Sequence, residues 1–213
     1  MVKWLTASLA LFISSAGASI TTVDFNALSP GDIVTDQFPG VSISLLGSPP
    51  IPGPRVYALK DNSGNPVEIF GASGNAITPG DNVGGINAPF YDMQLSFGHS
   101  IDYFSIMVLD AEEAVSAIGY LGGSQVQSVA QGQSLGFHSG SVFNGPVYLI
   151  ELGAVGGSRR FDRVVIDLTE SDGPELYDNV RFSTAAVPEP SVAILIALGA
   201  FALLLGRVGK KPQ

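Results

Sequence analysis

Val41-Ser42-Ile43-Ser44-Leu45 alternates apolar and polar side chains with a period of two residues. Successive side chains of a β-strand point to opposite faces, so this alternation predicts a strand with one face buried and the other in water. The second half of Phe161–Leu168 alternates in the same way. Both stretches therefore predict half-buried strands.

Further apolar runs predict strands along the whole middle of the chain. Including the two stretches above, the expected strands are 20–26, 41–46, 56–60, 66–70, 91–97, 101–109, 114–121, 125–130, 147–152, 161–168 and 176–182. Clusters of turn-forming residues separate them, at 29–32, 61–65, 78–82 and 171–174. No window shows the periodicity of an amphipathic helix with caps.

This pattern predicts an all-β domain. About eleven short strands in one domain favour an antiparallel two-sheet, jelly-roll-like sandwich, with a closed barrel as the competing architecture. A parallel α/β sheet is excluded because the chain has no crossover helices.

Composition excludes several classes of function. The 213-residue chain has no cysteine, which rules out a disulfide framework, a thiolate metal site and a cysteine nucleophile. Its formal net charge of −9 argues against nucleic-acid binding, which needs a basic face.

The N-terminus has the pattern of a secretory signal peptide. Lys3 supplies a positive charge, and the mostly apolar run Trp4–Ile13 follows. Ala16-Gly17-Ala18 then places small side chains where signal peptidase requires them. The apolar run is too short for a hydrocarbon core of ~30 Å, so we expect residues 1–18 to be removed after Ala18.

The C-terminus carries three features in order. Pro188-Glu189-Pro190 forces an extended backbone, and Val192–Gly206 is an uncharged apolar run that predicts a transmembrane helix. Three basic residues follow, Arg207, Lys210 and Lys211. By the positive-inside rule, this basic end stays cytoplasmic while the preceding domain is exported.

Together with the signal peptide, this order resembles the PEP-CTERM sorting signal of Gram-negative bacteria. The resemblance covers residues 187–211 and implies recognition and processing by an exosortase, in a family associated with exopolysaccharide and biofilm. It implies an inner-membrane anchor before processing, and a place at the cell surface or in the extracellular matrix afterwards. We therefore divide the chain into a signal peptide (1–18), a β-sandwich ectodomain (19–186) and a sorting signal (187–213).

The ectodomain offers few residues for catalysis. Its only histidines, His99 and His138, are isolated, with His99 in an expected turn at 97–100. Neither histidine has a nucleophile elbow or the spacing of a zinc hydrolase beside it. The adjacent acids Glu112 and Glu113 predict an exposed acidic turn. We therefore expect no enzyme activity, with a small hydrolase assembled in space as the remaining alternative.

Structural calcium is the one cofactor that the acids indicate. The last expected strand, around Asp178, resembles the closing strand of two-sheet carbohydrate-binding modules, where an Asp-Asn step can hold calcium. The terminal strands of such modules run side by side, so the resemblance implies that the first and last strands pair here and that Asp24, in the first, is a second ligand. The alternative is that Asp178 hydrogen-bonds backbone groups at the rim of the sandwich.

Two functions remain open from the sequence. The first is a non-catalytic envelope or matrix protein, with an exosortase, signal peptidase, the inner membrane and extracellular polysaccharide as partners. The second is a secreted carbohydrate-binding module with a structural calcium site. The loss of Trp4 with the signal peptide would leave only phenylalanine and tyrosine as stacking platforms for sugars.

Overall fold

The computed structural model describes residues 18–47, 53–60, 63–79, 91–109, 115–139, 144–167 and 176–184. All of them lie in one compact unit, Ala18–Ala185. They form thirteen strands: β1 (Ile20–Val23), β2 (Val41–Leu46), β3 (Arg55–Ala58), β4 (Glu68–Ile69), β5 (Ala72–Ser73), β6 (Asn75–Thr78), β7 (Asp92–Leu109), β8 (Ser116–Leu121), β9 (Ser124–Val129), β10 (Gln133–Ser139), β11 (Asn144–Gly153), β12 (Phe161–Asp167) and β13 (Leu176–Thr184).

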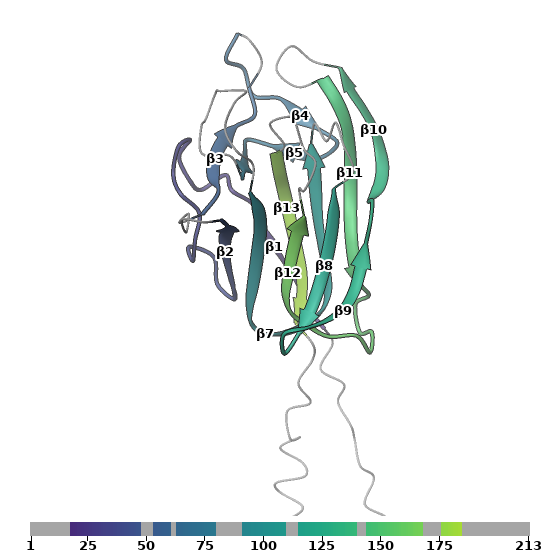
Figure 1. Cartoon of the computed structure of the whole chain (residues 1–213). Coiled ribbons are helices and arrows are strands. Elements are labelled where there is room, and N and C mark those ends of the chain that lie inside the picture. The colour runs from purple at the N-terminus through teal and green to yellow at the C-terminus, as the bar shows by residue number, and fades with distance from the viewer. Residues whose placement is uncertain are drawn as a thin grey trace, which may run out of the picture. The chain divides into compact units, whose positions relative to one another are not determined.

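The described part of the chain contains no helix, and within it nothing is long and apolar enough to cross a membrane. The predicted signal peptide up to Gly17, the Pro-Glu-Pro motif, the apolar run and the basic residues lie outside the described residues. Every strand pairing is antiparallel, which confirms the predicted all-β, antiparallel class (Figure 1).

The 18-residue strand β7 organises the fold. Its first half pairs with β2 on one edge and with β12 on the other, and β8 and β9 continue beyond β12. Its second half pairs with β11, which carries β10, and with β13. The edge of β13 that faces away from β7 pairs with β6 near the start of β13 and with β1 along the rest of it. The two halves of β7 therefore belong to two groups of strands.

β7 changes groups at a bend, where the sequence predicted a turn between two strands. Residues 97–100 stay in one continuous strand. The register of β12 shifts there, since Phe161 faces Ile101 while Arg163 faces Ser96. Seven residues of straight strand would separate Phe97 and Phe104 by about 23 Å, yet their ring centroids lie 6.2 Å apart, so β7 folds back on itself here (Figure 1). The predicted turn at 97–100 is therefore the place where the chain reverses, although these residues belong to one continuous strand rather than separating two.

The main core packs between the two groups of strands. Phe97 in the first half of β7 contacts Phe182 of β13, with ring centroids 5.2 Å apart, and Phe104 at 6.2 Å. The alternation that predicted β2 is confirmed, because Val41, Ile43 and Leu45 are buried. A smaller apolar cluster lies under β4, β5 and β6. The pairing among described strands ends at β2 and β9 in one group, so that group does not close into a barrel.

The terminal strands lie side by side, as the sequence predicted. Ile20 of β1 faces Ser183 of β13, and Val23 faces Val180. Three strands, β5, β6 and β10, were not predicted. The sequence misses two of these strands for simple reasons. β5 has only two residues, and β10 contains Gly136 at a register shift and does not alternate regularly between apolar and polar residues.

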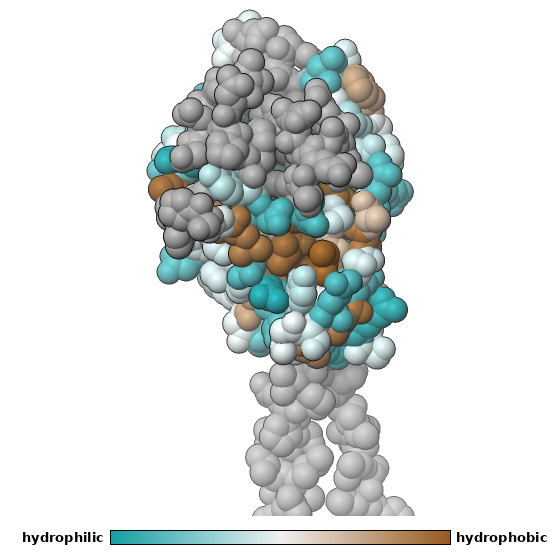
Figure 2. Space-filling model, viewed as in Figure 1, coloured by the Kyte–Doolittle hydropathy of each residue, from teal (hydrophilic) through white to brown (hydrophobic). Residues whose placement is uncertain are grey.

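The surface is mixed. Figure 2 shows a band of apolar side chains among polar ones on one face of the body. The most exposed aromatic side chains among the described residues are Phe70, between β4 and β5, and Phe137 in β10. The ring of Phe70 lies close over Gly136, where an added Cβ would come within 2.7 Å of the ring. The short β4–β5 hairpin therefore packs against β10.

The close packing of β8 on Phe161 gives a test of this core. A Cβ at Gly119 would lie 2.4 Å from the ring of Phe161, whereas a Cβ at Gly98 would meet nothing within 4 Å. We expect Gly119→Ala to lower the free energy of unfolding of a 19–186 fragment by about 1–3 kcal/mol, the usual cost of overpacking. Gly98→Ala is the matched control, and urea unfolding measures both. Equal stability of the two variants would contradict this packing.

Candidate functional site

Asp178 lies at a β-bulge in β13. Between Asp178 and Arg181 the strand advances three residues while β7 advances two, from Met107 to Ser105. Asn179 lies in the bulge, and its backbone adopts the left-handed conformation, with a φ of 53°. The bulge leaves the side chain of Asp178 only 2% exposed.

The bulge holds the β4–β5 hairpin. The side-chain amide of Asn179 donates to the carbonyl of Gly71 at 3.1 Å, and the backbone of Ser73 hydrogen-bonds to the carboxyl group of Asp178. Phe70 and Gly71 both have positive φ, as a two-residue type I′ turn requires. Phenylalanine adopts this conformation at a cost, so the contacts of the bulge keep a strained turn in place.

Asp24 reaches the same region from β1. Its Oδ1 accepts a hydrogen bond from the backbone N–H of Asn26 at 3.1 Å. The side-chain oxygen of Asn26 accepts from the N–H of Asn75 at 2.8 Å, and Asn75 donates to the carbonyl of Leu28 at 2.7 Å. These bonds tie the end of β1 to the start of β6. The structure thus brings Asp24 and Asp178 to one rim, on neighbouring strands.

The electrostatics of this rim are unbalanced. Burial raises the pKa of Asp178 to about 6, backbone hydrogen bonds from Asn179 and Ser73 oppose the rise, and the charge of Asp24 adds to it. Oδ1 of Asp178 accepts no hydrogen bond from the described residues. A buried carboxylate oxygen without a partner is costly, so this atom is where a cation or a proton is stabilised.

Both sequence interpretations of Asp178 are compatible with this geometry. Its contacts with Asn179 and Ser73 are those of a carboxylate that hydrogen-bonds backbone at the rim. Its Oδ1, which accepts no hydrogen bond, and the nearby carboxylate of Asp24 would form part of a set of oxygen ligands for a cation. Within the described ranges, no cluster of three or more His, Asp or Glu side chains has metal-binding geometry.

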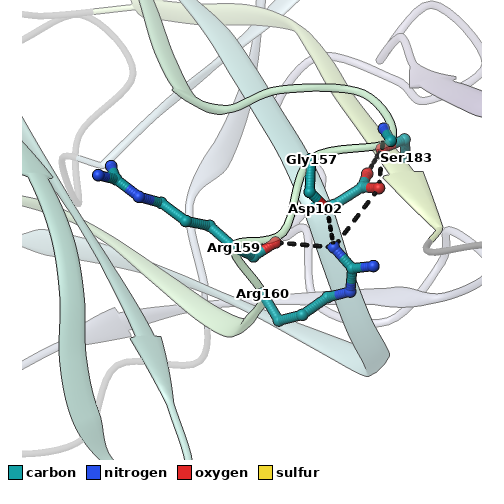
Figure 3. A network of polar contacts seen from close by, with 6 residues as sticks. Asp102, Gly157, Arg159, Arg160 and Ser183 are labelled. Carbon is teal, nitrogen blue, oxygen red and sulfur yellow. Dashed lines mark hydrogen bonds and ion pairs between the residues drawn. The ribbon is translucent and has the colours of Figure 1, made fainter.

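A second buried carboxylate, Asp102, was not singled out from the sequence. It lies at the bend of β7, is 1% exposed, and accepts hydrogen bonds from the hydroxyl of Ser183 and, at 2.9 Å, from the N–H of Gly156 (Figure 3). Arg160 Nη1 lies 3.7 Å from its Oδ2. The signal was present: Asp102 is a charged residue inside the apolar run 101–109.

The histidines do not come together as a catalytic site. His99 lies exposed at the bend of β7, and His138 lies in β10 opposite Gly145. Among the described residues, neither imidazole hydrogen-bonds to a serine. Glu112 and Glu113 lie outside the described residues.

No protein-family model matches the chain, and no curated protein matches it. Among solved structures, it is similar to TmCBM27, a carbohydrate-binding module described for mannan recognition, with 13% identity, a TM-score of 0.37, and coverage of 78% of this chain and 99% of that one. The module GH31 CBM32-2, bound to GalNAc, has 13% identity, a TM-score of 0.28, and coverage of 77% and 98%. At these scores the likeness carries no argument about ligands or site residues.

The raised pKa of Asp178 predicts a pH dependence of stability. Between the ordinary pKa of 3.8 and about 6, the folded state holds a proton that the unfolded state releases, so stability falls as the pH rises through this window. The full loss is about 3 kcal/mol above pH 6. In buffer with chelator, Asp178→Asn should flatten this part of the curve, as measured by urea unfolding from pH 3.5 to 8. Parallel curves for the variant and the wild type would contradict the assignment.

Proposed function

We propose that this chain is a non-catalytic exported protein of the cell envelope or extracellular matrix. In this proposal, signal peptidase removes residues 1–18, and the tail of residues 187–213 holds the body at the inner membrane. An exosortase then recognises Pro188-Glu189-Pro190 and processes the chain. The jelly-roll-like body is thereby delivered to the cell surface or the matrix, where its partner is extracellular polysaccharide.

One observation on the body supports this proposal. Ile20 and Ser183 face each other on paired strands, so the chain enters and leaves the body at the same edge. Because β13 ends at Thr184, one cut near Pro188 frees the body without breaking any strand or the pairing of β1 with β13. This arrangement is compatible with processing beside a C-terminal motif.

The proposal assigns no catalytic role to the body. His99 and His138 lie on different strands, and the two buried carboxylates, Asp102 and Asp178, are held apart on β7 and β13. Asp102 is occupied by Ser183, Gly156 and Arg160.

Processing of the tail is directly testable. In a host that contains an exosortase, we expect the mature protein to begin at Ser19 and to end near Pro188-Glu189-Pro190. Glu189→Ala should remain full length through Gln213, whereas Glu68→Ala, which changes an exposed acid of β4, should be processed normally. Intact-mass spectrometry of the purified wild type and of both variants measures where each mature chain begins and ends. A wild-type protein that keeps Gln213 would show the tail to be a simple anchor.

A carbohydrate-binding module with a structural calcium is the second candidate. The specific observation in its favour is the buried Oδ1 of Asp178, which lacks a hydrogen-bond donor and feels the charge of Asp24. Calcium takes six to eight oxygen ligands, drawn from carboxylates, amides and backbone carbonyls. In this candidate, Asp178 and Asp24 are the charged ligands, and calcium fixes the end of β1 to the bulge of β13.

Calcium binding to the folded state alone predicts a change in melting temperature. At about 100-fold over the dissociation constant it adds about 2.7 kcal/mol, which corresponds to roughly 5–10 °C for a domain of this size. Asp178→Asn should abolish the shift, and Asp36→Asn, which changes an exposed acid before β2, should keep it. Differential scanning calorimetry in calcium and in chelator decides. Equal melting temperatures of the wild type in both buffers would remove the calcium site.

A further inference from the structure

The loop between β11 and β12 forms an open cleft with β9. The cleft has a volume of about 280 Å³ and is lined by Gln127, Gly153, Ala154, Gly157, Ser158 and Arg159. It lies beside the Asp102 network and shares no lining residue with the rim around Asp178. Neither the catalytic alternatives nor the calcium candidate makes use of it.

The loop is held in one shape before any ligand arrives. The N–H of Ala154 donates to the carbonyl of Asp102 at 3.0 Å, and the N–H of Gly157 donates to the carbonyl of Ala154 at 2.8 Å. The N–H of Gly156 donates to the carboxylate of Asp102. Gly153 approaches so closely that an added Cβ would lie 2.1 Å from the carbonyl oxygen of Asp102. A preorganised loop costs little ordering free energy on binding.

Two adjacent arginines of this loop have different surroundings. Arg160 is used inside the protein: it donates to the carbonyl oxygens of Gly157 and Arg159 and neighbours the carboxylate of Asp102. The side chain of Arg159 points away from that network and is exposed (Figure 3). It has no partner among the described residues, so its guanidinium is available to a ligand.

The other polar groups of the cleft are also donors. Oε1 of Gln127 accepts a hydrogen bond from the N–H of Gly153 at 3.1 Å. The side-chain amide nitrogen of Gln127 is then left to donate to a ligand. Ser158 adds a hydroxyl. The negative charge of Asp102 is buried and compensated by its donors and by Arg160. In a chain of net charge −9, this cleft presents donors and one free cation.

From these groups we infer that the cleft binds an acidic sugar, a uronate unit of a polysaccharide. The guanidinium of Arg159 pairs with the sugar carboxylate through two parallel hydrogen bonds. Gln127 and Ser158 donate to hydroxyl or ring oxygens beside it. At about 280 Å³ the cleft is at the small end of ligand sites and takes one sugar unit of a longer chain. The inference rests on the proposed function in that it gives the polysaccharide partner a chemical class.

Calorimetry on the full-length chain in detergent micelles tests the inference. The probes are tri-galacturonate, the neutral trimer galactotriose, and tri-glutamate as an acidic peptide. We expect tri-galacturonate to bind at least ten-fold more tightly than either of the other two, and its affinity to fall with added salt because the contact is ionic.

Three variants separate the cleft from general charge effects. Arg159→Gln should weaken tri-galacturonate binding at least ten-fold. Gln127→Glu keeps an acceptor for the N–H of Gly153 but replaces the donor with a negative charge, so it should weaken binding as well. Lys60→Gln removes an exposed cation next to β3 and should leave the affinity within two-fold. Retention of the native near-ultraviolet circular dichroism shows that each variant is folded.

The outcomes distinguish this inference from the proposed function. If Arg159→Gln and Lys60→Gln bind tri-galacturonate equally, or if galactotriose binds as well as tri-galacturonate, the uronate site is overturned while a polysaccharide partner stands. If tri-glutamate binds equally and depends on Arg159, the cleft takes acidic peptides and the sugar class is wrong. If no sugar binds, the inference fails, whereas tail processing is judged separately by the mass of the mature protein.

Discussion

The fold depends on one strand that serves two sheets. β7 pairs along its first half with β2 and β12 and along its second half with β11 and β13, so every major strand group is hydrogen-bonded to it. The chain folds back at residues 98–100, and Phe97 and Phe104 on either side of this reversal meet in the core. A single continuous backbone thus fixes the relative position of the two groups, which separate strands would have to find by packing alone.

The two buried carboxylates lie where regular pairing breaks down. Asp102 lies at the bend of β7 and Asp178 at the bulge of β13, and each accepts hydrogen bonds from backbone N–H groups of a neighbouring loop or hairpin. Irregular strands leave such groups without ladder partners, and a carboxylate accepts several of them at once. The two differ in compensation. Arg160 neighbours Asp102, whereas burial raises the pKa of Asp178 and the charge of Asp24 adds to the rise.

The sequence predicts those features that depend on local pattern. The alternation at Val41–Leu45 identifies β2, and the pairing of the terminal strands places Asp24 near Asp178 as expected. Glycine, histidine and serine at 98–100 have the composition of a turn, and the chain does fold back there, although the strand continues through them. The Asp102 network joins residues more than fifty positions apart, and the cleft brings Gln127 to Gly153, 26 positions away; no local sequence pattern predicts such contacts.

The two candidate sites are at opposite ends of the same strand. Asp178 lies near the start of β13, whereas Ser183, which donates to Asp102 beside the cleft loop, lies near its end. Five residues of extended chain separate them by about 17 Å. Groups that far apart with no shared partner contribute independently. A cation at Asp178 would therefore order β1 and the β4–β5 hairpin, while a ligand at Arg159 would meet a loop already fixed by Asp102. The Asp102 end is also where Ile20 faces Ser183, so the cleft loop is braced against the edge through which the chain enters and leaves the body.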